Sequence, residues 1–507
     1  MSLTRFEEWL DAAGLKHELH QKQAVEWCLK REQALEHQGG IIADEMGLGK
    51  TIEIIGTMVS NPLNNTLIVL PYSLLGQWEK IITTLLGKKP LVFHGNSRKN
   101  LSVEDIMRFP IVLTTYGLIT QKKWVPEGER NKENPLYTIK WNRVVYDEAH
   151  HLRNKQTGGF VGALRLLTDI TWLMTGTPIQ NRADDLYSLY KLLGFKTPEY
   201  IKENIEKLVS IYILRRTKEM TGIILPTCHS SVVEVEWNHN KEEELSQKIH
   251  LNLSFSNLRT LHGLLDDGTS TETSSEMAVG EHLALLAKAK KMCVLPKLLK
   301  KTIKIGMEVG VIKAVPAKMT EMLRYTSKLE SVMEVIIARK NNGNPKLIFC
   351  YFHGEMDELE RLINAQGMSV KKFDGRTGKK ERAEILSKTS EVLIGQIDST
   401  SEGLNLQAYK EIYIVSPHWN PAIEDQAIGR CHRIGQTQEV HVFRFIMSGF
   451  TGFEELKEAP SALTLDQHIC NVQEIKRDII KTLLVDTIKE KEKEKEKKKK
   501  RRLIFVE

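Results

Sequence analysis

Short apolar runs alternate with longer amphipathic stretches in two separate parts of the chain. Within residues 39–177 the runs read GGIIA, TLIVLP, PLVFH, PIVLTTY, RVVYDEAH and TWLMTGTP, and after Pro345 they read KLIFCYF, SVKKF, EVLIG, EIYIV and EVHVFRFI. Apolar runs of strand length separated by helix-length segments are typical of parallel sheets covered by helices on both faces. The pattern predicts an α/β protein with two parallel-sheet lobes.

A mainly helical insertion is predicted between the two lobes, over residues 241–325. It is interrupted by the polar segment DDGTSTETSSE, which is too small and hydrophilic to bury and predicts a mobile loop near residues 266–281. The chain has 507 residues, enough for several domains. We therefore expect an N-terminal lobe at 1–240, the insertion, a C-terminal lobe at 326–480 and a charged tail at 481–507.

The formal net charge of +7 comes mostly from that tail. Residues 489–502 hold ten lysines and arginines against four glutamates. The rest of the chain is close to neutral, so a nucleic-acid groove in the folded body would have to be a local basic patch. The tail itself fits a solvated extension, a nuclear import signal or a nonspecific DNA clamp.

Apolar length and cysteine usage limit the cellular context. The longest apolar runs have strand length and the N-terminus lacks the basic-then-apolar pattern of a signal peptide, so we expect no membrane association. The six cysteines are scattered without a C-x-x-C pair, which argues against a disulfide framework or a zinc cluster. This usage fits a reducing compartment, the cytosol or the nucleus.

The segment ADEMGLGKT, residues 43–51, is the first candidate for chemistry. It lies between a predicted strand and a predicted helix, as a phosphate-binding loop does, although an aspartate stands where the pattern G-x-x-x-x-G-K-[ST] has its first glycine. In such a loop the N–H groups face the phosphates, the lysine reaches the β- and γ-phosphates and the threonine binds Mg2+. The other interpretation is a chance Gly-Lys-Thr. The candidate nucleotide-binding residues are Asp44, Glu45, Met46, Gly47, Leu48, Gly49, Lys50 and Thr51.

Two adjacent carboxylates, Asp147 and Glu148, end the predicted strand RVVYDEAH. Phosphoryl transfer to water needs an acid that holds Mg2+ and another that orients the attacking water. Asp147 suits the metal and Glu148 suits the water. The alternative is a solvated acidic turn at the end of a strand.

A cluster in the second lobe carries two arginines, Arg430 and Arg433, within DQAIGRCHRIGQ. Residues three apart on a helix share one face. Arginines that reach the γ-phosphate from another lobe raise hydrolysis rates by roughly 10^3 to 10^5. The alternative is an amphipathic surface helix with exposed arginines.

Taken together, these motifs resemble the SNF2 family of superfamily 2 helicase-like ATPases, in order and from about Leu19 to Ile446. Further matching segments are LPYSLLGQWEKI, LTTYG, DEAHHLRN, MTGTPIQNRADDLYSLYKLL, LRRTK and HWNPAIEDQAIGRCHRIGQ. In that family the phosphate loop normally reads DEMGLGKT, without the first glycine. Compact members encoded by large DNA viruses, the global transactivators, are similar in length and motif spacing. The resemblance implies two RecA-like lobes that use ATP and Mg2+.

The resemblance also assigns roles to individual residues. The implied catalytic residues are Lys50, Asp147, Glu148, Arg430 and Arg433, with Thr51 and Asp147 at the metal. Gln21 would recognise adenine, although His20 stands where the family usually has an aromatic residue. Thr175, Gly176, Thr177 and Gln426 would couple the movements of the two lobes. Thr115, Tyr116 and Trp419 are candidates for DNA contact, with loop packing and a core tryptophan as the equally open alternatives.

The implied function is that of a DNA-dependent ATPase. Such a motor translocates on double-stranded DNA, contacts mainly the phosphate backbone and remodels DNA-bound proteins or chromatin, which influences transcription. Nucleosomes and transcription proteins are further candidate partners. The expected location is the nucleus, the host nucleus for a viral protein, with the cytoplasm as a second location. The alternative function is a DNA-bound scaffold that regulates transcription and holds ATP as a structural ligand.

Overall fold

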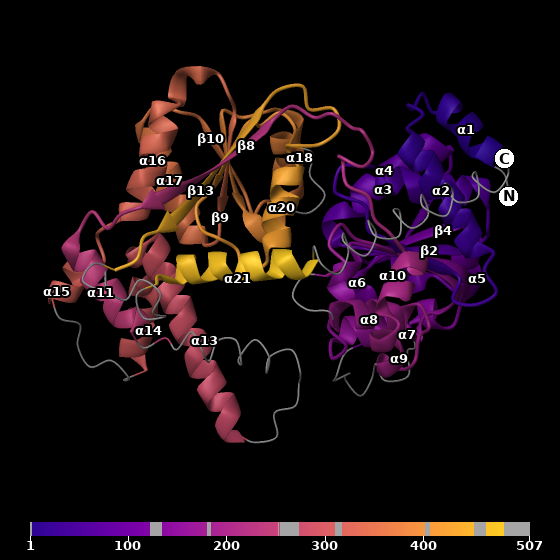
Figure 1. The fold of residues 1–507 in the computed structure, drawn as a ribbon, viewed down its shortest axis with the longest axis horizontal. Helices are drawn as coiled ribbons and strands as arrows, with labels where there is room; N and C mark the ends of the chain where they lie inside the picture. Colours follow the sequence, from indigo (N-terminus) through magenta and orange to yellow (C-terminus); the bar gives the residue numbers. More distant parts are fainter. Residues whose placement is uncertain are drawn as a thin grey trace, which may run out of the picture. The chain divides into compact units, whose positions relative to one another are not determined.

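The computed structural model describes residues 3–121, 134–179, 184–251, 253, 273–309, 317–400, 406–450 and 463–480. The chain divides into two compact units, of which unit 1 extends to Ile224 and unit 2 comprises Leu225–Ile475. Each unit contains a parallel sheet with its own hydrophobic core, and Figure 1 colours them by sequence. Among the described residues, no helix has both the length and the apolar character needed to cross a membrane.

The sheet of unit 1 has seven strands in the order β3-β4-β2-β5-β6-β1-β7, and every neighbouring pair is parallel. The strands are β1 Gly39–Ile42, β2 Thr66–Leu70, β3 Leu91–Val92, β4 Ile111–Thr115, β5 Lys140–Asp147, β6 Leu167–Met174 and β7 Ile213–Leu214. The helices are α1 Leu3–Ala12, α2 Leu19–Glu32, α3 Lys50–Ser60, α4 Leu75–Leu86, α5 Val103–Met107, α6 Tyr116–Ile119, α7 Gly158–Arg165, α8 Asp184–Leu192, α9 Pro198–Glu203 and α10 Ile205–Tyr212.

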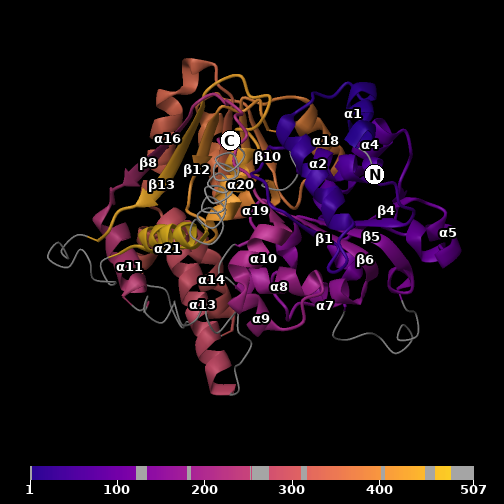
Figure 2. The same cartoon turned by 45° about the vertical axis from the view of Figure 1, so that its right-hand side comes forward.

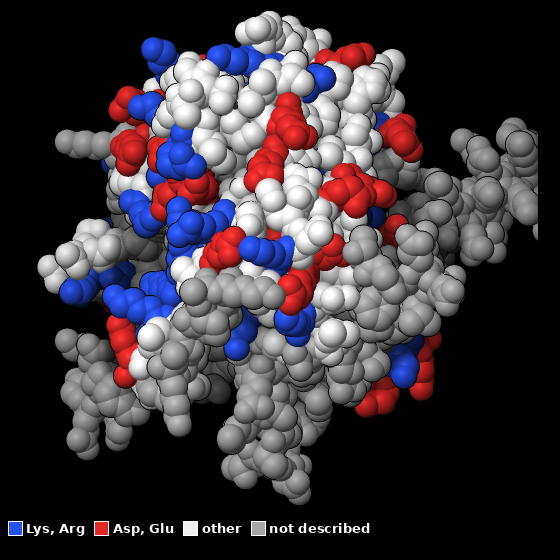
Figure 3. Space-filling view, turned by 90° about the vertical axis from the view of Figure 1, so that its left-hand side faces the viewer, with Lys and Arg blue, Asp and Glu red and all other residues white. Residues whose placement is uncertain are grey.

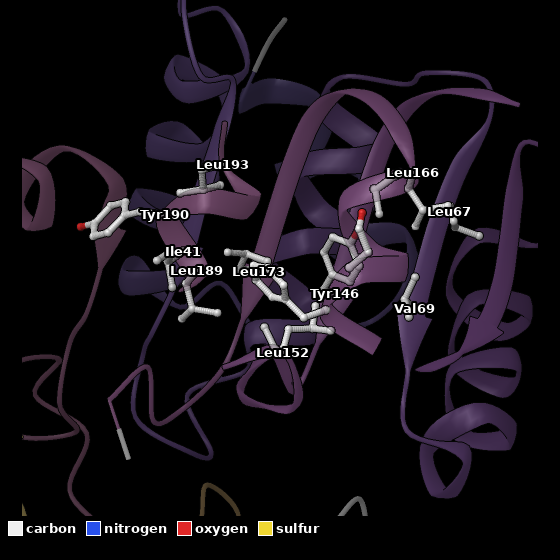
Figure 4. Close-up of a cluster of buried hydrophobic side chains, with 14 of the residues drawn as sticks. Ile41, Leu67, Val69, Tyr146, Leu152, Leu166, Leu173, Leu189, Tyr190 and Leu193 are labelled. Carbon is white, nitrogen blue, oxygen red and sulfur yellow. The ribbon is translucent and has the colours of Figure 1, made fainter. Parts of the chain in front are cut away.

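Successive strand residues of unit 1 are buried on opposite faces, because side chains alternate along a strand. Ile41 and Leu67 belong to the core beneath α7, α8 and α10, part of which Figure 4 shows, whereas Ile42 and Ile68 belong to the core beneath α1–α4. Figures 1 and 2 both show the two groups of helices on opposite sides of the sheet. The central strands therefore bury residues on both faces, which is why the sequence shows apolar runs such as TLIVL in β2.

The sheet of unit 2 has six parallel strands in the order β10-β11-β9-β12-β13-β8. They are β8 Cys228–Val235, β9 Lys346–Cys350, β10 Val370–Phe373, β11 Val392–Gln396, β12 Glu411–Ile414 and β13 Val440–Met447. The helices are α11 Asn240–His250, α13 Thr273–Val294, α14 Leu299–Glu308, α15 Ala317–Met322, α16 Ser327–Ala338, α17 His353–Ala365, α18 Lys379–Ser387, α19 Ile397–Thr400, α20 Pro421–Gly429 and α21 Leu465–Ile480.

The predicted fold class is confirmed: two parallel-sheet lobes of the α/β class, with helices between them in sequence. The division lies at residues 224/225 rather than after residue 240, because β8 pairs along its whole length with β13 of the second sheet. This edge strand has mostly exposed or half-buried side chains, so it lacks the continuous apolar run of a central strand.

Two other predicted segments, the loop near 266–281 and the tail at 481–507, lie partly or wholly outside the described residues. Part of the loop predicted near 266–281 lies outside the described residues, but the chain is already helical from Thr273, where α13 begins. The continuous helix-forming run MAVGEHLALLAKAKKM extends this helix toward its N-terminus. The charged tail at 481–507 lies outside the described residues.

Charges of both signs are interspersed on the face shown in Figure 3. Lysine and arginine side chains gather in one area of that face, and aspartate and glutamate side chains surround it and cross the rest. The surface in this view therefore carries no field of a single sign. This arrangement agrees with the nearly neutral composition of the chain outside its tail.

Candidate nucleotide site

The phosphate-loop candidate connects the end of β1 to the start of α3. Gly47 and Gly49 have φ values of 92° and 93°, in the left-handed region that glycine adopts without strain. A Cβ atom at Gly49 would lie 2.4 Å from Nε2 of Gln21, so a larger residue there would displace the end of the Gln21 side chain. The loop thus leads directly into the N-terminus of α3, whose free N–H groups suit an anion.

Lys50 is the first residue of α3 and turns back over the loop. Its Nζ donates a hydrogen bond to the Asp44 carbonyl oxygen at 2.8 Å. Burial lowers the pKa of Lys50, and the carboxylates of Glu148 and Asp44 oppose that shift. The ammonium group is therefore held among carboxylates from β5 and from the loop itself.

Asp147 and Glu148 lie at the carboxyl end of β5, two strands from β1 in the sheet. The Asp147 carboxylate accepts hydrogen bonds from Trp78 Nε1 at 2.7 Å and from the Glu148 N–H at 3.0 Å. Burial, followed by the charge of Glu148, raises the pKa of Asp147 to about 6. Glu148 has φ 51° and ψ 50°, a left-handed conformation that costs energy for a residue other than glycine and is common at functional sites.

The coupling segment predicted at 175–177 follows β6, between β5 and β1. Thr175 Oγ1 accepts a hydrogen bond from the Thr177 N–H at 3.1 Å and lies 3.4 Å from His150 Nδ1. The same nitrogen lies 3.4 Å from a carboxylate oxygen of Glu148. His150 therefore links the catalytic candidate Glu148 to the coupling segment.

Gly176 packs directly on the phosphate loop. A Cβ atom at this position would lie 2.7 Å from Cε of Met46 and 3.6 Å from Nζ of Lys50. Because β5, β6 and β1 are adjacent and parallel, the loops at their carboxyl ends meet at one edge of the sheet. The structure thus brings the loop, the carboxylates and the coupling segment together.

Gln21, the adenine candidate, also lies against the loop. Its Nε2 donates to the Leu48 carbonyl oxygen at 3.1 Å, and His20 Nε2 lies 2.9 Å from the same oxygen, which requires the proton on that ring nitrogen. Both side chains are buried. Gln21 therefore lies at the nucleotide loop, where an adenine reader would have to be.

The first two DNA-contact candidates lie at the end of β4. Thr115 is buried in the sheet, whereas the Tyr116 hydroxyl donates to the Asp147 carbonyl oxygen at 2.6 Å. The Tyr116 ring also lies 5.2 Å from the ring of His151. This loop therefore packs on the backbone of the carboxylate pair.

The remaining candidates belong to unit 2. Gln426 is buried on α20, Arg430 caps the end of that helix and Arg433 follows it. Burial, and next the positive charge of Arg430, lowers the pKa of Arg433, which means that the two guanidinium groups lie near each other. Trp419 packs against the unit 2 core, with its ring edge-on to His468 at 6.3 Å. These residues form a second group, separate in the chain from the unit 1 site.

Sequence reasoning left one part of the site unassigned. The motif LRRTK, residues 214–218, places Arg216 against Asp44, the residue that replaces the first glycine of the usual loop pattern. Trp78, the donor to Asp147, also had no assigned role. In the sequence, this part of the site was marked only by the LRRTK motif itself, because the contacts that it makes join residues far apart in the chain.

The donor set fits ATP with Mg2+. Backbone N–H groups at the start of α3 and the Lys50 ammonium suit phosphates, while the Thr51 hydroxyl and the Asp147 carboxylate are oxygen ligands of the kind Mg2+ prefers. Mg2+ in nucleotide sites is usually held by one or two side chains together with phosphates and water. Thr51 and Asp147 supply that number.

Two protein-family models match the chain: an SNF2-related domain at residues 20–199 and a helicase conserved C-terminal domain at residues 327–435. These matches include both groups of candidate residues. The first covers the loop, the carboxylates and the coupling segment, and the second covers Gln426, Arg430 and Arg433.

Two curated relatives and one solved structure are similar to this chain. The "probable global transactivator" of Orgyia pseudotsugata multicapsid polyhedrosis virus is 28% identical, over 92% of this chain and 95% of that protein. An ATP-dependent helicase of Mycoplasma pneumoniae is 27% identical over 92% of this chain, which spans only 42% of that longer protein. The solved Sulfolobus solfataricus SWI2/SNF2 ATPase core in complex with dsDNA is 24% identical, with a TM-score of 0.37, over 92% of this chain and 96% of that one.

Proposed function

Because this chain belongs to the SNF2 family of helicase-like ATPases, we propose that it hydrolyses ATP to move along double-stranded DNA. The observation that carries the proposal is the meeting of three strand-end loops in unit 1. Lys50, Glu148 and Thr175 come from loops after β1, β5 and β6, and the contacts of His150 and Gly176 join those loops. ATP binding, water activation and mechanical coupling therefore share one edge of one sheet.

In the proposed site each residue has one task. Lys50 and the N-terminus of α3 bind the phosphates, and Thr51 and Asp147 hold Mg2+, which supplies charge neutralisation on the phosphate oxygens. Glu148 orients the attacking water, with His150 at 3.4 Å from its carboxylate restricting its position. Gln21 reads the adenine from its place against the loop.

Arg430 and Arg433 are proposed to act as arginine fingers from the second lobe. Arg430 and Arg433 are both half-buried, and the charge of Arg430 contributes to the lowered pKa of Arg433, so the pair offers a local concentration of positive charge for a γ-phosphate. Hydrolysis then depends on both units, and the gain expected from such residues is roughly 10^3 to 10^5 in rate. Coupling between hydrolysis and the movement of the two lobes would pass through Thr175, Gly176, Thr177 and Gln426.

The proposed track is double-stranded DNA, held mainly through its phosphates. The Tyr116 hydrogen bond to the Asp147 backbone connects a DNA-contact candidate to the metal carboxylate, which gives DNA a route to influence hydrolysis. Trp419 is the corresponding candidate in unit 2. The name of the viral relative supports a role in transcription, and remodelling of DNA-bound proteins or nucleosomes in the nucleus is the proposed form of that role.

The test is an ATPase assay with no nucleic acid, single-stranded DNA, duplex DNA and RNA. Duplex DNA should raise kcat, and Glu148→Gln should abolish the increase while leaving ATP bound. Glu199→Gln, the same chemical change at an exposed position on α9, serves as the matched control and should behave as the wild type. Hydrolysis that RNA stimulates equally, or that Glu148→Gln retains, would refute the proposal.

A further inference from the structure

Residues 214–218, LRRTK, contact the phosphate loop, helix α3, the segment that carries Gln21 and the coupling segment. We name this segment the strap. It begins at the end of β7, which pairs with β1 directly before the phosphate loop. The Ala43 N–H donates to the Leu214 carbonyl at 2.7 Å, and the Glu45 N–H donates to the Arg216 carbonyl at 2.9 Å. The strap therefore continues the sheet alongside the loop.

Arg216 is the buried centre of the strap. Its Nε lies 3.0 Å and 3.2 Å from the two carboxylate oxygens of Asp44, and its backbone N–H donates to Asp44 Oδ1 at 2.8 Å. Its Nη2 donates to Glu53 of α3 at 2.8 Å, and its Nη1 donates to the His20 carbonyl. One guanidinium group thus joins the start of the loop, the helix after it and the segment that carries Gln21.

The charges around Arg216 favour this arrangement. Burial opposes the charge of the guanidinium, but hydrogen bonds to Asp44 hold the pKa of Arg216 above its usual value. Burial, and next the charge of Asp44, raises the pKa of Glu53 well above its usual range. Arg216 therefore lies between two buried carboxyl groups, those of Asp44 and Glu53, and makes more of its contacts with Asp44.

The two flanking basic residues extend the contacts. Arg215 Nη1 donates to the carbonyl oxygens of Ala43 at 3.0 Å and Gly176 at 3.2 Å, so it joins the phosphate loop to the coupling segment. Lys218 pairs with the Glu45 carboxylate at 3.0 Å, and its backbone N–H donates to the same carboxylate at 2.9 Å.

The strap also lies next to the connection between the two units. Residues 219–224 follow it and lead to the start of unit 2 at Leu225, after which β8 enters the second sheet. Gly222 in this connection has φ 70° and open space around its Cα, and Ile224 is almost fully exposed. The strap is therefore the last segment to contact the nucleotide site before the chain leaves unit 1.

We propose that the strap couples the position of residues 219–224, which connect the two units, to the conformation of the phosphate loop. Arg216 is the positioning residue, and the Glu45–Lys218 ion pair is the outer contact that can adjust. This inference rests on the proposed function for the identity of the nucleotide. A displacement of residues 219–224 shifts the strap, and with it Asp44 and Glu45. By linkage, nucleotide bound at the loop restrains the connection to the same extent.

The first test uses the outer pair, because loss of the buried Arg216 also threatens folding. In Lys218→Ala, the affinity for a fluorescent ADP analogue, measured without DNA, should fall about fivefold or more, with the urea midpoint of unit 1 unchanged. The KM for ATP should rise more than kcat falls. Exchange of the two charges, Glu45→Lys with Lys218→Glu, should restore at least half of the lost affinity.

The matched control is Lys196→Ala, an exposed lysine of unit 1 outside the strap, which should bind the analogue as the wild type does. Wild-type affinity in Lys218→Ala, or no recovery on charge exchange, would overturn the positioning role. Because this readout needs neither hydrolysis nor DNA, it can fail or succeed independently of the ATPase assay on Glu148→Gln.

The second test addresses the connection to unit 2. Two glycines inserted after Ile223 lengthen the connection beyond the hydrogen bond that the Ile223 N–H donates to the Lys218 carbonyl oxygen of the strap at 3.2 Å. Affinity for the ADP analogue without DNA should stay as in the wild type, while the change in that affinity on adding duplex DNA should fall at least about threefold. DNA binding is followed separately by fluorescence anisotropy and should be retained. An insertion protein with unchanged coupling would show that the strap does not transmit the position of the connection.

Discussion

Replacing Asp44 by asparagine gives the sharpest test of why this loop lacks its first glycine. The substitution keeps the shape of the side chain and removes its charge. Asp44 is fully buried and is bound by Arg216 through both the guanidinium group and the backbone N–H. We expect the substitution to destabilise unit 1, because it leaves the Arg216 guanidinium buried without its main counter-charge.

The size of the effect follows from the third member of the cluster. Removing one partner of a buried ion pair costs about 3–5 kcal/mol. A carboxylate oxygen of Glu53 lies 2.8 Å from Arg216 Nη2, so a second acidic group stays beside the guanidinium when Asp44 is replaced. We therefore expect the lower end, about 3 kcal/mol, for Asp44→Asn. Glu53→Gln leaves the Asp44 carboxylate, which makes more contacts with Arg216, in place and should cost only about 1 kcal/mol.

Urea unfolding followed by tryptophan fluorescence measures both variants. Trp78 and Trp172 are buried in the unit 1 core, so the emission change reports on that unit once Trp237 and Trp419 of unit 2 are replaced by phenylalanine. Matching slopes are needed before the midpoints are compared as free energies. The reasoning is refuted if Asp44→Asn is as stable as the wild type, or if Glu53→Gln is destabilised as much as Asp44→Asn.

Three further outcomes are expected. Burial lowers the pKa of His250 from 6.5 to about 4, so the unfolded chain binds more protons than the folded chain between these pH values. Unit 2 should therefore keep its full stability above about pH 6.5 and lose about 3 kcal/mol on acidification to about pH 4. In His250→Gln the urea midpoint of unit 2 should change less with pH. Gly176→Ala should raise the KM for ATP about tenfold, because the new Cβ would lie 2.7 Å from Met46 Cε. Adding Met46→Ala should bring the KM back toward the wild-type value, and a KM that stays raised would argue against this contact. Tyr116→Phe removes the 2.6 Å hydrogen bond to the Asp147 carbonyl oxygen and should cost about 1 kcal/mol of stability. It should reduce the stimulation of hydrolysis by duplex DNA more than it reduces the basal rate. Equal reductions would exclude Tyr116 as the connection between DNA and the carboxylate.

Local patterns were sufficient for the central strands and for the ends of those strands. β2 buries both faces and forms a continuous apolar run, and in β5 the shorter apolar run VVY directly precedes Asp147. Glycines at 47 and 49 were readable because the left-handed backbone requires them. Placing parallel strands in one sheet also puts the loops after β1, β5 and β6 at the same edge, whereas the order of the strands along the sheet comes from the tertiary structure.

The sequence predicts the edge strands and the boundary between the two units less well than the central strands. β8 is mostly exposed or half-buried, so the apolar periodicity that marks central strands is weak in it. Its pairing with β13 depends on a partner more than two hundred residues away, and residues 228–235 were therefore assigned to the wrong lobe. No local signal in the sequence distinguishes the two sheets to which that strand could be added.

By itself, the sequence determined the α/β class and the family, and it predicted the residues of the candidate phosphate loop, because each depends on neighbours within a few turns of chain. Only the tertiary structure decided what Asp44 contacts. Its partner Arg216 is 172 residues away, and a buried carboxylate is tolerated only where folding delivers a cation to it. That pairing arises because β7 lies beside β1, a property of the assembled sheet that neither segment carries alone.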